Sequence, residues 1–272
     1  MATLPGVTIT VEDGNLGRLP ANQDGVCGII LGPSAVAPSG AALMTPYLIR
    51  SLKEAEALGI TRAYDTANTV LVWHQLKEFY DERQGPQPLW FIISNQVPTA
   101  YFDEDGEADK LMVSSGGNIR MVAACYTPPD GAPGTRTNGL PNTVITMVTE
   151  AETFRVRQFA KHRPVRVIVE GYGIESADSL TYDLRASAGP QADGVQVVIG
   201  QAPGLLPSSM ADHNIYASAA RVLGRYSRIA VHRSAGRVKD GPLVGLLSAN
   251  LSDGTSIANL SDALAEQLNE YG

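Results

Sequence analysis

The chain has 272 residues, of which 44% are hydrophobic and 18% charged, so it has the composition of a globular protein with one large domain or two small ones. Its formal net charge is −7, from 28 acidic and 21 basic residues. A general nucleic-acid binder needs a basic surface that displaces counterions from phosphates, so this balance argues against that class of protein.

The first expected element is a strand at residues 7–11, where valine and isoleucine alternate with threonine to give one apolar face. A polar, glycine-rich connection follows it. Such a tethered strand either pairs within its own domain or adds to a sheet edge of another subunit through main-chain hydrogen bonds. The candidate residues for inter-subunit strand addition are Val7, Thr8, Ile9, Thr10 and Val11.

Helices and strands then alternate along the chain. Apolar runs predict strands at 26–32, 89–94, 118–125, 165–170, 195–200 and 228–232. Helical spacing predicts helices at 46–58, 65–83 and 143–162, and one that Asp212 caps. This alternation, with near-continuous apolar strands, is typical of an α/β fold in which helices cover a mostly parallel or mixed sheet.

Several polar residues have an expected place in these elements. Asp65 is a plausible N-cap of the helix at 65–83, and His74 is expected on the flank of that helix. The basic residues at 155–166 and 221–239 fit helix ends and exposed edges. Cys27 and Cys125 lie in apolar runs, so we expect buried free thiols.

The chain divides into three expected parts. Residues 1–24 form an N-terminal arm with its connection, and residues 25–235 form the α/β body. Residues 236–272 are expected to begin a C-terminal domain, with a last helix at 261–268. Because a helix that ends in glycine usually leads into another element, the end at Gly272 predicts that a C-terminal portion is missing.

The strand at 165–170 ends in Gly171-Tyr172-Gly173, which invites a dinucleotide-binding interpretation. That motif needs a third small residue three positions further on, and it is absent here. Tyr172 would crowd a pyrophosphate and Glu175 would repel it, so a strand-end turn is the better interpretation.

No other pattern in the sequence indicates an active site. The chain contains no phosphate loop, no nucleophile elbow, and no histidine or cysteine pair at metal-binding spacing. We therefore assign no catalytic, cofactor-binding or metal residue and expect no cofactor. The alternative is an α/β enzyme or nucleotide-binding protein that uses the strand ends near 171–176 and 200–204, since ligands of such sheets bind beyond the carboxyl ends of the strands.

The order of several segments resembles the tail-sheath proteins of contractile phage tails and related injection machines. The matching segments are LPGVTITVEDG at 4–14, GVCGIILGPSAVAPSG at 25–40, TPYLIRSLKEAEALGI at 45–60, the helix and strand at 68–93, HRPVRVIVEG at 162–171, and ASAARVLGRYSRIAVHRSAGRV at 217–238. The likeness is greatest to a compact sheath-like branch that was formerly catalogued as a domain of unknown function. Sheath proteins normally continue into a C-terminal domain and arm, and this chain departs from that pattern.

The resemblance implies a structural subunit and no enzyme. Subunits would form hexameric rings stacked in a helix around an inner tube, joined by strand exchange between terminal arms, and would contract to drive the tube. The implied partners are further copies of the chain, the inner tail tube protein and baseplate components, with no nucleic acid and no membrane. Its place would be the cytoplasm during assembly and then a virion tail or a phage-like particle. A third possibility is an interaction module elsewhere in a tail.

Overall fold

The computed structural model describes residues 25–128, 132, 134–174, 194–200, 216–229, 243–244, 250–251 and 256. The strand expected at 7–11, the arm at 1–24 and the helix at 261–268 lie outside these residues. The division of the chain into arm, body and C-terminal part therefore stays a prediction.

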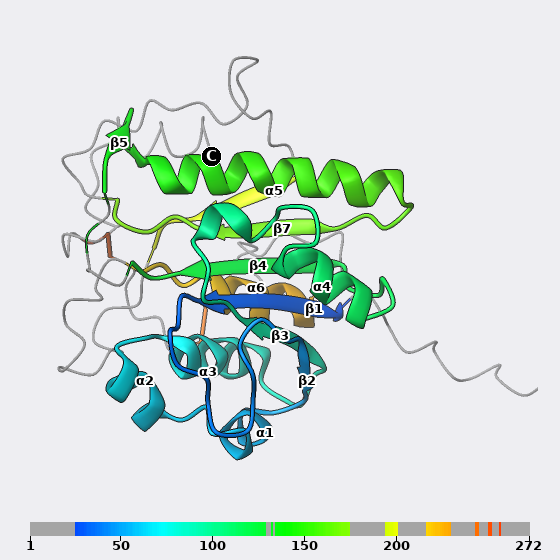
Figure 1. Ribbon diagram of the computed structural model, residues 1–272, viewed down its shortest axis with the longest axis vertical. Helices are drawn as coiled ribbons and strands as arrows, with labels where there is room; N and C mark the ends of the chain where they lie inside the picture. The colour runs from blue at the N-terminus through cyan, green and yellow to red at the C-terminus, as the bar shows by residue number, and fades with distance from the viewer. Residues whose placement is uncertain are drawn as a thin grey trace, which may run out of the picture.

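A six-stranded sheet forms the centre of the described structure (Figure 1). From one edge to the other its strands are β2 (Tyr47–Ile49), β3 (Leu89–Ile93), β1 (Cys27–Gly32), β4 (Met121–Tyr126), β7 (Arg166–Glu170) and β8 (Val195–Val198). Only β2 pairs in the antiparallel direction, with β3, and the other four pairings are parallel. The expected α/β fold with a mixed sheet is confirmed.

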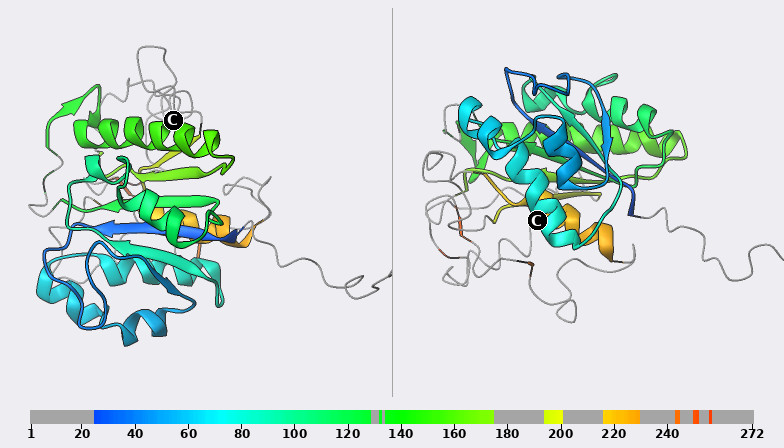
Figure 2. Two further views of the ribbon diagram at one scale, coloured as in Figure 1. Left: turned by 45° about the vertical axis from the view of Figure 1, so that its right-hand side comes forward. Right: turned by 90° about the horizontal axis from the view of Figure 1, so that it is seen from below.

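Helices cover both faces of the sheet (Figure 2). One hydrophobic core lies under α4 (Glu107–Ser114) and α5 (Asn142–Ala160). The other lies under α3 (Val72–Arg83) and α6 (Ala219–Arg228). Strand β7 contributes to both cores, because Val167 and Val169 face α5 while Ile168 faces α6. The strand expected at 165–170 is therefore buried on both faces.

The strand order creates a switch point in the sheet. The chain runs from β1 to β3 on one side of β1, and then returns past β1 to β4, β7 and β8 on the other side. In sheets of this order the connections from the first strand leave on opposite faces, which opens a crevice beyond the carboxyl ends of the strands. The position of a candidate pocket therefore follows from topology.

The prediction of a helix at 46–58 is wrong for the first part of that range. Tyr47–Ile49 form β2 instead, and the Tyr47 ring stacks on Phe91 of β3 with centroids 5.6 Å apart. Only α1 (Leu52–Ala57) is helical, and its N-cap is Ser51, whose hydroxyl accepts a hydrogen bond from the Glu54 amide. Sheet pairing and aromatic stacking override the three-residue apolar spacing here.

The helix expected at 65–83 is two helices, α2 (Arg62–Asn68) and α3. Asp65 lies inside α2, where Thr61 is the N-cap. The Asp65 carboxylate nevertheless caps α3, since it accepts hydrogen bonds from the amides of Trp73 and His74 at 2.9 Å each. The prediction of Asp65 as an N-cap residue is therefore wrong in position, because Thr61 and Leu71 hold the N-cap positions, although the Asp65 carboxylate does bind the first amides of α3.

The other elements match the sequence with shifted ends. The helix expected at 143–162 is α5, and the strand expected at 118–125 begins later, as β4. Arg228 ends α6 rather than beginning a strand, and residues 230–232 lie outside the described part. Asp212 also lies outside it, and α6 begins after Ser218. Short elements complete the fold: η2 (Pro98–Ala100), β5 (Arg136–Thr137) and β6 (Leu140–Pro141).

Substituting Val167→Asp is expected to unfold the domain, because it places an unpaired charge in a fully buried strand. Circular dichroism and thermal unfolding measure the outcome. The matched control is Val156→Asp, since Val156 lies on α5 with 55% of its surface exposed. A Val167→Asp variant as stable as that control would contradict the assignment of β7 to the core.

Candidate functional site

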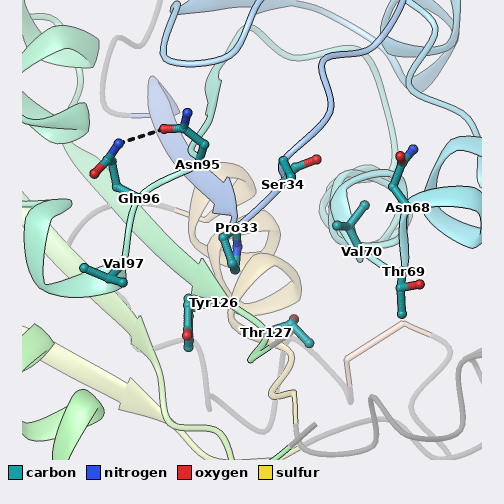
Figure 3. A pocket seen from close by; sticks show the side chains of 11 residues that line it. Pro33, Ser34, Asn68, Thr69, Val70, Asn95, Gln96, Val97, Tyr126 and Thr127 are labelled. Atoms are coloured by element: carbon teal, nitrogen blue, oxygen red, sulfur yellow. Dashed lines mark hydrogen bonds between the residues drawn. The ribbon is translucent and has the colours of Figure 1, made fainter. Parts of the chain in front are cut away.

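A pocket of about 420 Å³ opens at the switch point of the sheet. It is lined by residues 33–35 after β1, 95–97 after β3, 126–127 at the end of β4, and 68–70 between α2 and α3. Figure 3 shows Asn95, Gln96 and Val97 on one side of the pocket and Asn68, Thr69 and Val70 on the other. The size is within the range of small-molecule sites, roughly 300–1,000 Å³.

The pocket wall combines amide, hydroxyl and apolar groups, and none of the described residues that line it is charged. Ser34 and Tyr64 share a hydrogen bond of 2.7 Å between their hydroxyls, and Asn68 Nδ2 donates to the Tyr64 carbonyl oxygen. Gln96 Nε2 donates to Asn95 Oδ1 at 2.9 Å. These described residues offer hydrogen-bond donors and acceptors, and they supply no counter-charge for a phosphate or carboxylate.

The strand-end turn after β7 is part of the core and offers no space for a cofactor. Residues 171–174 are all buried, and the Tyr172 ring packs against Tyr126 with centroids 5.3 Å apart. A Cβ on Gly171 would meet Val197 Cγ1 at 2.5 Å. The carbonyl oxygen of Gly173 accepts a hydrogen bond from Arg136. The interpretation of this stretch as a scaffold turn agrees with its packing, while residues 175–176 and 201–204 lie outside the described part.

Glu170, the last residue of β7, is fully buried and connects three parts of the chain. One carboxylate oxygen accepts hydrogen bonds from Gln75 Nε2 (3.1 Å) and the Tyr126 amide (2.8 Å), and the other accepts from the Ala217 amide (2.6 Å). Burial raises the pKa of this carboxyl well above its usual range. Glu170 thus joins the end of β4, helix α3 and the start of α6.

Two ion pairs join α3 to α6 out of contact with water. Glu78 Oε1 lies 3.1 Å from Arg221 Nη2, and Glu82 Oε1 lies 2.5 Å from Arg225 Nε. All four residues are at most 1% exposed. Gly224 allows the approach of the two helices, because a Cβ there would meet the Phe79 carbonyl oxygen at 2.5 Å.

Glu82 and Arg221 also bind the main chain of Val244, which lies much later in the sequence. The Val244 amide donates to Glu82 Oε2 at 2.5 Å, and Arg221 Nη1 donates to the Val244 carbonyl oxygen. Both main-chain groups of Val244 therefore bind side chains of the α3–α6 pairs.

Several expected surface residues are buried in this region. Arg221 and Arg225 were expected on exposed edges, and they are enclosed by the carboxylates of α3. His74 was expected on a helix flank, but it is 6% exposed and its Nε2 lies 3.2 Å from the Tyr216 hydroxyl. Burial lowers the pKa of His74. The sequence around these three residues did not indicate their burial. Tyr216, which contacts His74, and the carboxylates that contact the two arginines are all 142 or 143 residues away in the chain.

The remaining candidates among the described residues are the cysteines, metal-binding side chains and possible membrane spans. Cys27 and Cys125 are buried free thiols, as predicted, and burial raises the pKa of both. No group of three metal-binding side chains and no helix long and apolar enough to cross a membrane occurs in the part of the chain that the structure describes. The strand-addition residues 7–11 lie outside that part, so their role stays a prediction.

A family model described as DUF2586, N-terminal domain, matches residues 4–272. The chain belongs to the DUF2586 family. No curated protein sequence matches it. The resemblance to tail-sheath proteins remains a prediction, since the family shown is DUF2586.

Two solved structures are similar to this DUF2586 chain. One is a chain of the anti-feeding prophage (AFP) baseplate, 6-fold symmetrised and solved by cryo-EM, with 15% identity and a TM-score of 0.52 over 100% of this chain. The other is from the AFP helical sheath in the contracted state, with 16% identity and a TM-score of 0.45 over 86% of this chain. This chain spans 62% of the length of the first and 54% of the second. The first likeness shows a shared fold.

Removing one partner of a buried ion pair is expected to destabilise the DUF2586 domain strongly. Glu82→Leu leaves the buried Arg225 guanidinium without its carboxylate, at a cost of about 3–5 kcal/mol. The double variant Glu82→Leu/Arg225→Leu removes both charges and is expected to be more stable than the single variant. Urea denaturation measures both values.

A matched control is the exposed pair Lys77–Asp81 on the same helix. Its variant Asp81→Ala is expected to cost less than about 1 kcal/mol. If the double variant were as unstable as Glu82→Leu alone, the two charges would not act as a pair.

The Asp65 carboxyl is expected to make the stability of the DUF2586 domain depend on pH. Burial raises its pKa from 3.8 to about 7, so the folded protein keeps a proton that the unfolded chain has lost between these values. Stability therefore falls as pH rises through this window. The decline is expected to be shallower in Asp65→Asn, measured by urea denaturation across the window. Asp81→Asn is the control, and identical pH profiles for wild type and Asp65→Asn would contradict the shifted pKa.

Proposed function

We propose that the chain is a structural subunit of a contractile injection machine, of the tail-sheath type. The observation that carries this proposal is the likeness in fold to a chain of the AFP baseplate over 100% of the present chain. The sequence resemblance to tail-sheath proteins supports it independently, because it rests on the order of short segments rather than on the fold. In this role the chain assembles as stacked hexameric rings around an inner tube and contracts to drive that tube.

The buried connections between the elements suit such a role. A subunit that transmits force between neighbours has to move as one body. The Glu–Arg pairs tie α3 to α6, and Glu170 ties both helices to the sheet. Breaking such pairs is costly, so relative motion of these elements is disfavoured.

Strand exchange is the proposed joint between subunits. Among the described residues, β8 has a neighbouring strand on one side only, and all four of its residues are partly exposed. An unpaired sheet edge accepts an added strand through main-chain hydrogen bonds. The strand at residues 7–11 of a neighbouring copy is the proposed occupant. The further partners are the inner tube protein and baseplate components, within a phage-like particle.

A baseplate component is the second candidate, favoured by the AFP baseplate likeness itself. The two candidates differ in the assembly that they predict. A sheath subunit forms an open helical stack because its contacts along the axis do not close, whereas a baseplate component forms single closed rings.

Electron microscopy of the full chain, alone and with tube protein, is expected to show rings or stacked tubes. Two variants test the strand joint, Thr8→Pro and Ile9→Pro, because adjacent amides point to opposite sides of a strand and proline removes the amide hydrogen. At least one of them is expected to abolish assembly.

Thr8→Val, which keeps the amide, is the control, and it is expected to assemble like the wild type. Unchanged thermal unfolding in all three variants separates assembly from folding. Persistent monomers in the wild type would overturn the structural proposal, while normal assembly of both proline variants would overturn only the strand joint.

A further inference from the structure

We propose that the pocket at the switch point is a binding site for a small neutral hydroxyl-rich ligand, of the size of a monosaccharide. This inference goes beyond the structural role and does not depend on it. It rests on the position of the pocket, the chemistry of its wall, a buried hydroxyl with no partner and a strained residue at its rim.

The position is the one that topology favours for ligands in this type of sheet. The lining segments follow the carboxyl ends of β1, β3 and β4, on either side of the point where the strand order reverses. The main chain holds these segments in place, since the Ser34 amide donates to the Ser94 carbonyl oxygen (2.8 Å) and the Thr127 amide donates to that of Gly32 (3.1 Å). The pocket is therefore built on strand ends.

The wall selects against charged ligands. None of the lining residues in the described part of the chain is acidic, basic or histidine, so an ionised phosphate would lose water without gaining a counter-charge from them. The Asn68, Asn95 and Gln96 amides each carry a donor and an acceptor, which matches a ligand hydroxyl that both donates and accepts. The apolar lining, including Val70 and Val97, suits the C–H surface of a sugar ring.

Thr127 supplies a polar group that lacks a partner. The residue is 6% exposed, and its Oγ1 is buried and has no hydrogen-bond partner within the described residues. A buried hydroxyl without a partner is costly, which makes it an unusual residue to find in a pocket wall unless a ligand completes it. The hydrogen of such a hydroxyl turns about the Cβ–Oγ1 bond to suit a partner.

Thr69, at the opposite rim, has φ 55° and ψ 47°, the left-handed conformation. A β-branched residue rarely adopts it, and backbone strain of this kind is concentrated at ligand-binding and active sites. In Figure 3, Thr69 lies beside Asn68 and Val70, whereas Thr127 lies near Tyr126.

The test is saturation-transfer NMR and thermal shift on the full chain, with D-glucose and N-acetyl-D-glucosamine as neutral probes. AMP and inorganic phosphate are the charged probes. We expect at least one neutral probe to bind and both charged probes to fail. Binding of the charged probes alone, or of no probe at millimolar concentration, would overturn the proposal.

Two variants locate the binding. Thr127→Val removes the hydroxyl with little change of shape and is expected to weaken binding about fivefold without lowering the melting temperature, because no native hydrogen bond is lost. Ala35→Trp fills the pocket from an exposed position and is expected to abolish binding.

The matched control is Thr149→Val, on the exposed side of α5, which is expected to bind like the wild type. Unchanged binding in both pocket variants would place the ligand elsewhere and overturn the proposal. Ligand binding is measured without any assembly of the chain. A negative binding result therefore says nothing against the proposed structural role, and failure to assemble says nothing against the ligand site.

Discussion

The contact between α3 and α6 is the constraint on which most of the described structure depends. Four charged side chains meet there with almost no exposure: Glu78 pairs with Arg221 and Glu82 with Arg225, and Glu82 Oε1 also lies 3.3 Å from Arg228 Nη2. Burial of a single charge costs several kcal/mol, so every group in this contact requires its partner in place. The docked position of α6 therefore depends on the carboxylates of α3, and that of Val244 depends on side chains of both helices.

Glu170 extends this dependence to the sheet. It ends the strand that lies between the two hydrophobic cores, and its three hydrogen bonds reach α3, the end of β4 and the start of α6. The carboxyl end of the sheet is therefore organised by polar contacts, whereas its middle is organised by apolar packing. The pocket lies at the same edge of the sheet, among the loops that follow β1 and β3 and the end of β4.

Much of the fold could be predicted from the sequence, because apolar runs such as those of β1, β3 and β7 reflect local burial. What could not be predicted depends on residues that are distant in the chain. The burial of Arg221 and the place of β2 beside β3 each depend on the tertiary arrangement. The candidate pocket was missed for the same reason, since its neutral residues come from four segments and carry no motif, whereas the Gly-Tyr-Gly turn had a recognisable pattern and no space for a ligand.

The spacing of the ion pairs has a mechanical consequence. Glu78 and Glu82 are four residues apart, as are Arg221 and Arg225, so the charges repeat once per helical turn on both helices. A small sliding of α6 along α3 would leave all four charges misaligned, and only a displacement of a full turn, about 5.4 Å, would restore one pair. The interface therefore has discrete positions and no continuous range. A gradual sliding of α6 along α3 within the domain is therefore disfavoured at every intermediate position.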